Sequence, residues 1–211
     1  MTTSVIIPAY NEAPTLGAVV RASRQAAGVR EVIVVDDGSS DETALAGRWA
    51  GAHRVLRLPR NRGKGAAVRM GAEVAGGECL LLLDGDLRGL APAHPTSLIE
   101  PVRRGVAHMT LGVLARGRIS TDLAQAMTPW LSGQRAVLRS ALDHLDDLGG
   151  TSFTLEVALN RWCRRARGTV QTVELPGVTH RWKEEKLGFV AGAAARMRMY
   201  WEIVRYSARS A

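Results

Sequence analysis

The chain of 211 residues is poor in aromatic residues and cysteine. Aromatic residues make up only 5% of it, and no known nucleic-acid-binding motif is found, so we expect no nucleic-acid partner. The two cysteines, Cys79 and Cys163, lie far apart, and neither belongs to a Cys-x-x-Cys pattern. Their spacing predicts two free thiols in a reducing compartment rather than a disulfide.

Long apolar runs are also missing. No uncharged apolar stretch approaches the roughly 18 residues that a membrane span needs, and no charged-then-apolar leader precedes the first predicted strand. We therefore expect a cytoplasmic protein, with contact to the inner face of a membrane left open. A hydrophobic content of 46% is ample for a packed core.

Lysine is scarce, because 25 of the 28 basic residues are arginine. Residues 1–100 carry 11 basic and 11 acidic residues, whereas residues 101–211 carry 17 and 9, so the net charge of +8 belongs to the second half. Arginine suits bidentate contacts with phosphate, which indicates an anionic ligand or surface facing that half. A general bias toward arginine is the alternative explanation.

The first half alternates between strand and helix patterns. Strands are predicted over Ser4–Ile7, Glu31–Val35, Arg54–Leu58 and Cys79–Leu83, with helices over 14–27, 41–50 and 65–75. Connections of this length favour a parallel sheet in an α/β fold. No G-x-G-x-x-G follows the first strand, which disfavours a nicotinamide or flavin enzyme.

The second half is less regular, but we expect it to share the same sheet. It predicts strands over 108–114 and 170–175, and helices over 95–104, 121–127, 136–145, 155–167 and 187–207. The whole chain is interpreted as a single domain. It comprises a nucleotide-binding half (1–90), an acceptor half (91–186) and a C-terminal amphipathic helix (187–211).

Two predicted strands end in acidic residues. Val32–Val35 runs into Asp36-Asp37-Gly38, and Leu80–Leu83 runs into Asp84-Gly85-Asp86. The carboxyl ends of parallel strands meet at one edge of the sheet, where open α/β folds bind ligands. Carboxylates there bind a metal ion or the hydroxyl and N–H groups of a sugar or base. The sequence therefore predicts a nucleotide-sugar site.

Four segments together carry a family resemblance. They are Pro8-Ala9-Tyr10-Asn11-Glu12, Val34 to Thr43 (VVDDGSSDET), Asn61 to Ala67 (NRGKGAA) and Leu83-Asp84-Gly85-Asp86. In order and spacing they resemble the family 2 glycosyltransferases with the GT-A fold, a Rossmann-like α/β single domain with a mostly parallel sheet flanked by helices. Within that family the chain is most similar to polyprenol- and dolichol-phosphate sugar transferases and, less closely, to glucosyl-3-phosphoglycerate synthases.

The resemblance implies a metal and a donor pocket. Asp86 would bind Mg²⁺ or Mn²⁺, Asp84 the ribose or the metal's water shell, and His180 would be a further ligand, unless it is structural. Gly85 lets the backbone approach the phosphates closely. The remaining donor-binding residues implied are Pro8, Ala9, Tyr10, Glu12, Asp37 and Lys64. Tyr10 as a core aromatic and Lys64 as a surface lysine are the alternatives.

The acceptor side rests on the same resemblance. Glu156 would be catalytic, as a general base toward a hydroxyl acceptor or as a positioning group toward a phosphate, which is already a nucleophile. A helix-terminal glutamate is the alternative. The residues implied to bind the acceptor or a phosphate are Arg116, Arg118, Ser132, Gln134 and Arg135. The basic, aromatic-containing helix over 187–207 suits a membrane surface, a homodimer contact or packing on the core.

The predicted function is metal-dependent transfer of one sugar from a UDP- or GDP-sugar to an anionic acceptor, preferably a polyprenyl phosphate. Transfer to a small phosphorylated acid, as in the glucosyl-3-phosphoglycerate synthases, is the alternative enzyme activity. A non-catalytic nucleotide- or nucleic-acid-binding module is the alternative of another class. Metal-dependent release of nucleoside diphosphate separates the enzymes from such a module.

Overall fold

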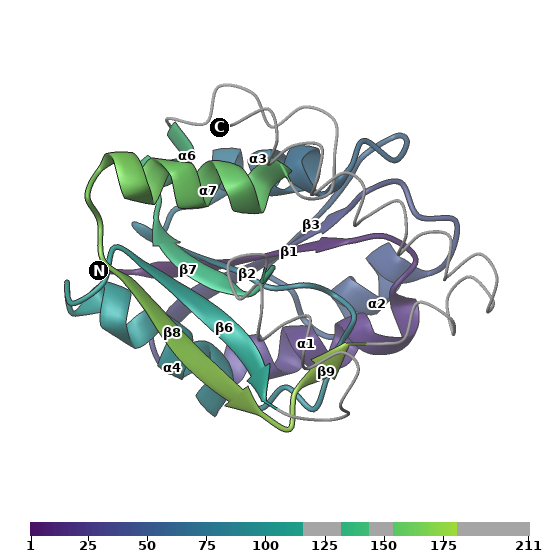
Figure 1. Cartoon of the computed structure of the whole chain (residues 1–211). Coiled ribbons are helices and arrows are strands. Elements are labelled where there is room, and N and C mark those ends of the chain that lie inside the picture. The colour runs from purple at the N-terminus through teal and green to yellow at the C-terminus, as the bar shows by residue number, and fades with distance from the viewer. Residues whose placement is uncertain (116–131, 144–153, 181–211) are drawn as a thin grey trace, which may run out of the picture. The chain divides into compact units, whose positions relative to one another are not determined.

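The computed structural model describes residues 1–115, 132–143 and 154–180, and its centre is a seven-stranded sheet (Figure 1). The strand order is β3-β2-β1-β4-β7-β6-β8. Its strands are β1 (Thr3–Ala9), β2 (Val29–Asp36), β3 (Arg54–Arg57), β4 (Cys79–Leu82), β6 (Met109–Ala115), β7 (Arg135–Leu138) and β8 (Val170–Pro176). Two short strands, β5 (Leu87–Arg88) and β9 (Thr179–His180), form a separate two-stranded sheet.

The sheet is mostly parallel, as predicted. β1 pairs in parallel with β2 and β4, β2 with β3, and β6 with β8, whereas β7 is antiparallel to both β4 and β6. The strands of both sequence halves therefore join in one sheet, which confirms that expectation. Residues Met1–Thr179 form one compact unit.

Helices cover both faces of the sheet (Figure 1). The helices are α1 (Ala13–Gln25), α2 (Thr43–Trp49), α3 (Lys64–Val74), α4 (Ala93–Arg103), α6 (Ser140–Asp143) and α7 (Thr154–Arg165). Helices α1 and α4 lie on one face, and α3 and α7 lie on the other.

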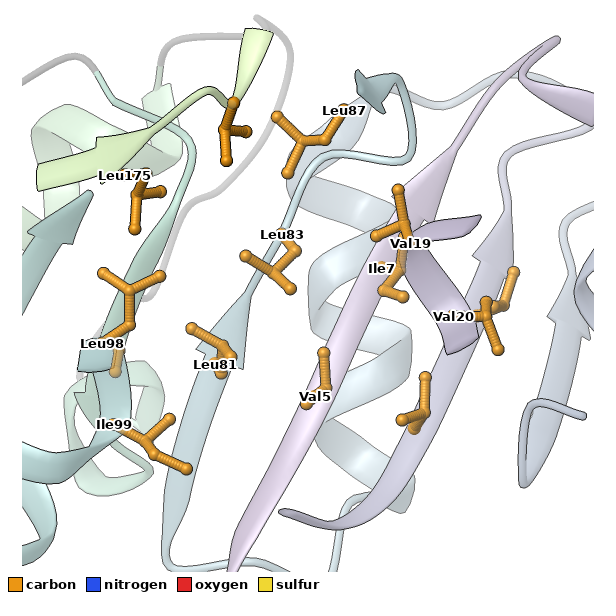
Figure 2. Packing of buried hydrophobic residues seen from close by; sticks show 14 of the residues in the cluster. Val5, Ile7, Val19, Val20, Leu81, Leu83, Leu87, Leu98, Ile99 and Leu175 are labelled. Atoms are coloured by element: carbon orange, nitrogen blue, oxygen red, sulfur yellow. The ribbon is translucent and has the colours of Figure 1, made fainter. Parts of the chain in front are cut away.

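Alternation along the strands divides the core between the two faces. Val5 and Ile7 of β1 point to the face that also holds Val19 and Val20 of α1 (Figure 2), whereas Ile6 packs in the cluster on the other face. Each of these side chains is fully buried, so β1 is apolar on both sides. A continuous apolar run is what a central parallel strand requires.

One predicted element is wrong. The helix expected over 136–145 begins instead as strand β7, and a short helix, α6, follows it. Ala136 and Val137 are fully buried, and β7 pairs with β4 on one side and β6 on the other. Pairing on both sides outweighs the helical propensity of this segment, which a local pattern does not reveal.

The remaining sequence predictions about thiols and membrane spans can be compared directly. Cys79 and Cys163 are buried free thiols, as expected. Within the part of the chain that the structure describes, no helix combines the length and apolarity needed to cross a bilayer. The helices predicted over 121–127 and 187–207 lie outside the described residues.

Candidate functional site

The predicted donor motifs gather at the carboxyl edge of the sheet. β1, β2 and β4 are parallel neighbours, so the loops that follow Ala9, Asp36 and Leu82 emerge side by side. The amide of Asp37 donates to the Ala9 carbonyl (2.9 Å), which joins the first two loops directly. This edge is where open α/β folds bind ligands.

The side chains at the end of β1 and in the loop that follows it differ in burial. Pro8 and Ala9 are buried in the strand, while Tyr10 is 44% exposed, so the alternative of Tyr10 as a core aromatic is wrong. Glu12 is buried, and its amide donates to Thr43 Oγ1 (2.8 Å). A Cβ on Gly85 would clash with the Glu12 carboxylate, so glycine is what lets these two loops approach.

Asp36, the last residue of β2, and Asp37, which follows it, both hold neighbouring loops by hydrogen bonds. Asp36 accepts from the Ser39 amide (2.8 Å) and forms an ion pair with Arg57 (3.2 Å between Oδ2 and Nε). The two carboxylate oxygens of Asp37 accept from the amides of Arg62 and Gly63, each at 2.8 Å. Asp37 thereby fixes the loop that opens α3, and its implied role in donor binding stays a prediction.

Lys64, the first residue of α3, lies between two carboxylates. Its Nζ is 2.7 Å from Asp84 Oδ1 and 2.8 Å from Glu156 Oε1, and its side chain is only 16% exposed. The alternative of a solvated surface lysine is therefore wrong. Burial alone would lower the pKa of the Lys64 ammonium, but the carboxylates of Asp84 and Glu156 outweigh burial and raise that pKa.

Asp84 is held on its other oxygen by Gln134. Gln134 Nε2 donates to Asp84 Oδ2 (2.7 Å), and Ser132 Oγ donates to Gln134 Oε1 (3.0 Å). Gly133, between these two residues, lies so close to the ion pair that a Cβ there would meet both Asp84 and Lys64. The Ser132 to Gln134 segment thus orients the first aspartate of the Asp-Gly-Asp turn.

Arg135 is fully buried and joins β7 to α7. Its guanidinium donates to the Ser132 carbonyl from Nε (3.0 Å) and Nη2 (2.6 Å), and from Nη1 to the Glu156 carbonyl (3.3 Å) and Asn160 Oδ1 (3.2 Å). Burial lowers the pKa of Arg135 to about 10, although Glu156 and Asp84 act in the opposite direction.

This supporting arrangement was not anticipated from the sequence. Ser132, Gln134 and Arg135 were predicted to contact phosphate, whereas all three side chains are buried and bonded to protein groups. Direct phosphate contact by them stays a prediction. The available signal was a run of three polar residues interrupted by Gly133, at the start of a buried strand. Arg116 and Arg118 lie outside the described residues.

Glu156, in the first turn of α7, is 3% exposed. Its Oε1 accepts from Lys64, while its Oε2 is buried without a hydrogen-bond partner among the residues that the structure describes. A buried carboxylate oxygen of this kind is costly unless a ligand donates to it. The position suits the predicted catalytic role, which stays a prediction.

The three predicted metal ligands come together. Asp84, Asp86 and His180 each offer one ligand atom, and these atoms all lie within 4.8 Å of one another. The turn that carries the two aspartates is held by Thr15, whose Oγ1 donates to the Gly85 carbonyl (2.9 Å). Two carboxylates and one imidazole fit a cation such as Mg²⁺ or Mn²⁺.

A Rossmann-like sheet with this acidic edge defines a protein of the GT-A class. The family model described as "Glycosyl transferase family 2" matches residues 4–161. The chain therefore belongs to glycosyl transferase family 2, which confirms the resemblance predicted from the four motifs.

Comparison with curated proteins finds relatives named for lipid-phosphate acceptors. A human dolichyl-phosphate beta-glucosyltransferase is 40% identical over an alignment of 98 residues, and the match covers 39% of this chain and 30% of the relative. An undecaprenyl-phosphate 4-deoxy-4-formamido-L-arabinose transferase of Aeromonas hydrophila subsp. hydrophila is 31% identical over an alignment of 155 residues, and the match covers 69% of this chain and 46% of the relative. The chain thus spans less than half the length of each.

Comparison with solved structures finds glucosyl-3-phosphoglycerate synthases, the second group that the sequence resembles. Glucosyl-3-phosphoglycerate synthase from Mycobacterium tuberculosis, in complex with Mn²⁺, UDP-glucose and phosphoglyceric acid, superposes with a TM-score of 0.70 at 28% identity. The match covers 85% of this chain and 71% of that one. The similarity confirms the GT-A fold, and the structure of this relative contains a divalent cation together with a nucleotide sugar.

Proposed function

We propose that this protein is a metal-dependent glycosyltransferase that moves one sugar from a nucleotide-sugar donor to a phosphorylated acceptor. The observation that carries the proposal is the cluster of Asp84, Asp86 and His180, whose ligand atoms lie within 4.8 Å of one another. When bound there, a divalent cation would neutralise the charge that develops on the leaving diphosphate. Family membership and the solved relative with Mn²⁺ and UDP-glucose support the same conclusion.

The donor residues divide into a nucleoside side and a phosphate side. Pro8, Ala9, Tyr10 and Glu12 would border the nucleoside, with Asp37 fixing the adjoining loop and accepting from the base. Lys64 would face the diphosphate, where the N-terminus of α3 adds backbone N–H groups that favour anions. We propose UDP-glucose as the first donor to test, because solved relatives bind it.

The acceptor proposed first is a polyprenyl phosphate, for which several curated relatives are named, although one is a glucosyl-3-phosphoglycerate synthase. A phosphate oxygen is already nucleophilic at neutral pH, because the second pKa of such a group is about 6. Glu156 would then orient the acceptor rather than deprotonate it. The arginines predicted to hold the acceptor phosphate are Arg116, Arg118 and Arg135, with Ser132 and Gln134 beside them.

The second candidate acceptor is a small phosphorylated acid. The structural similarity to a synthase bound to phosphoglyceric acid favours it. A hydroxyl acceptor must lose its proton, so Glu156 would act as a general base or hydrogen-bond acceptor. The two acceptors therefore assign different roles to the same carboxylate.

The location and assembly of the protein are also proposals. A lipid-phosphate acceptor requires contact with a membrane surface, for which the basic and aromatic residues between 187 and 211 are suited. We expect the purified protein to bind vesicles with anionic lipid at low salt and to lose that binding at high salt. Protein that ignores such vesicles would favour the small acceptor or a dimer role for that segment.

The test of the proposed function has two stages. In the first, UDP- and GDP-sugars are screened by thermal shift with and without Mn²⁺, since only a ligand that binds the native state raises the melting temperature. In the second, release of nucleoside diphosphate is measured with undecaprenyl phosphate in detergent and with 3-phosphoglycerate. Binding without release in either assay would indicate a non-catalytic nucleotide-binding module.

A further inference from the structure

Both oxygens of the Asp84 carboxylate already have protein partners. Lys64 Nζ lies 2.7 Å from Oδ1, and Gln134 Nε2 lies 2.7 Å from Oδ2. Asp84 is also one of the three groups that could hold a metal ion. A divalent cation that binds Asp84 must therefore displace or share one of these contacts, and the ammonium is the partner that repels it.

Lys64 and Arg135 both lie near Glu156, but they are held in different ways. The Arg135 guanidinium is fully buried and is bound to the carbonyls of Ser132 and Glu156 and to Asn160. Lys64 instead carries its charge at the end of a flexible four-carbon chain, and its Nζ pairs with the ends of two side chains, Asp84 and Glu156. Its first helical turn also offers N–H groups that attract phosphate.

We propose that Lys64 and the divalent cation compete for Asp84, and that the diphosphate of the nucleotide ends the competition by drawing Lys64 onto itself. This inference rests on the proposed function. Metal binding then depends on the nucleotide. Binding of Mn²⁺ alone is weakened by the internal ammonium, and the nucleotide removes that obstacle as it supplies its own phosphate oxygens to the metal.

The same movement couples the donor to Glu156. Lys64 also pairs with Glu156 Oε1 (2.8 Å), whose other oxygen is buried without a partner among the described residues. When Lys64 turns to the diphosphate, both oxygens of Glu156 become available to the acceptor or the sugar. Lys64 is thus a positioning residue that frees the acceptor-side carboxylate only after the donor has arrived.

Binding of Mn²⁺ without turnover tests the proposal. Free Mn²⁺ is counted by electron paramagnetic resonance in titrations of the wild type, Lys64→Met and Arg62→Met, each with and without UDP. We expect Lys64→Met to bind Mn²⁺ alone on the order of tenfold more tightly, and UDP to tighten Mn²⁺ on the order of tenfold less than in the wild type. Arg62 is an exposed cation on the same loop, so Arg62→Met should change Mn²⁺ binding less than about twofold.

Glu156→Gln distinguishes competition between Lys64 and Mn²⁺ for Asp84 from a general effect of charge on Mn²⁺ binding. Removing a negative charge near a metal site ordinarily weakens binding of a cation. Competition predicts the opposite, because Lys64 loses one of its two carboxylate partners and leaves Asp84 more readily. We therefore expect Glu156→Gln to bind Mn²⁺ alone about threefold more tightly than the wild type. This variant also keeps the proposal testable if Lys64→Met does not fold.

Three results would overturn the inference. They are unchanged Mn²⁺ binding in Lys64→Met, an equal gain in Arg62→Met, and weaker Mn²⁺ binding in Glu156→Gln. If the wild type binds no Mn²⁺ even with UDP or GDP, the proposed function itself fails. Nucleotide-dependent Mn²⁺ binding in the wild type together with any of the three results would leave the proposed function intact and remove only the role of Lys64.

Discussion

The two acidic strand ends look alike in the sequence but are built differently. Asp37, after β2, accepts from two backbone amides, those of Arg62 and Gly63. Asp84, after β4, contacts two side chains, with Lys64 on one carboxylate oxygen and Gln134 on the other. Backbone partners cannot leave without unfolding a loop, whereas side-chain partners can exchange for a ligand. The comparison indicates that the Asp37 side is a fixed frame and the Asp84 side is the part that responds to metal and donor.

The largest loss of activity is expected from a change in the Asp84-Gly85-Asp86 turn. Asp86→Ala removes one of three candidate ligands and should lower metal-dependent release of nucleoside diphosphate by a hundredfold or more, on the order of 3 kcal/mol in the barrier. The free energy of unfolding should change little. Asp86→Asn, which keeps the shape, is the control, and near-normal turnover in either variant would remove Asp86 from the site.

Asp37→Ala should act on stability instead. Loss of two charge-assisted hydrogen bonds to backbone amides predicts a decrease of about 3 kcal/mol in the free energy of unfolding, measured with urea. Asp37→Asn retains one acceptor oxygen and should lose about half as much. A stable Asp37→Ala protein that has lost only nucleotide binding would contradict the fixed-frame interpretation.

Gln134→Leu tests whether the responsive side needs its supporting contact. Removal of the amide that orients Asp84 should weaken Mn²⁺ binding in the presence of UDP by about tenfold, as is usual for groups that orient metal ligands. Gln134→Glu places a second carboxylate beside Asp84. It should lower the free energy of unfolding at least as much as Gln134→Leu does. Unchanged Mn²⁺ affinity in Gln134→Leu would show that Asp84 binds the metal without help from this contact.

The smallest effect is expected at the opposite edge of the sheet, where Glu31 also accepts from a backbone amide. Its Oε1 accepts from Gly76 and from Ser4 Oγ, both at 2.7 Å. Burial alone would raise the pKa of Glu31, but these hydrogen bonds and nearby arginines outweigh it and lower that pKa. The resulting stability is present above the ordinary glutamate pKa of about 4.3 and is lost as the pH falls through the lower folded value.

Glu31→Gln should therefore flatten the acid limb of the stability curve. We expect a loss of about 1 kcal/mol at pH 7 and a smaller loss near pH 3, measured by urea unfolding at both values. Nucleotide and metal binding should be unaffected, since Glu31 lies at the amino edge of the strands. A loss of Mn²⁺ binding in Glu31→Gln would contradict the claim that Glu31 contributes to stability alone.

Local sequence patterns were sufficient to predict the strands and turns whose formation depends on neighbouring residues in the chain. The four parallel strands of the first half follow from the alternation of strand and helix patterns, and the Asp84-Gly85-Asp86 turn follows from an apolar run that ends in acidic residues. Family resemblance added His180, which no local pattern could place beside Asp84 and Asp86, because the two segments are far apart in the sequence.

The missed features all depend on long-range pairing. Strand β7 exists because β4 and β6 flank it, and the ion pair of Lys64 with Glu156 joins residues 92 positions apart. The burial of Arg135 and its hydrogen bond to the Glu156 carbonyl were also missed, because they depend on the packing of α7 on the sheet. The phosphate contact that the family resemblance implies for Arg135 stays a prediction.

The most direct test of the account is calorimetric titration of the wild type and Asp86→Ala with UDP, with and without Mn²⁺. We predict that the wild type binds UDP at least tenfold more tightly with Mn²⁺, and that the metal makes no difference to Asp86→Ala. Equal affinity with and without Mn²⁺ in the wild type, or a full Mn²⁺ effect in Asp86→Ala, would contradict a metal-dependent donor site at this edge of the sheet.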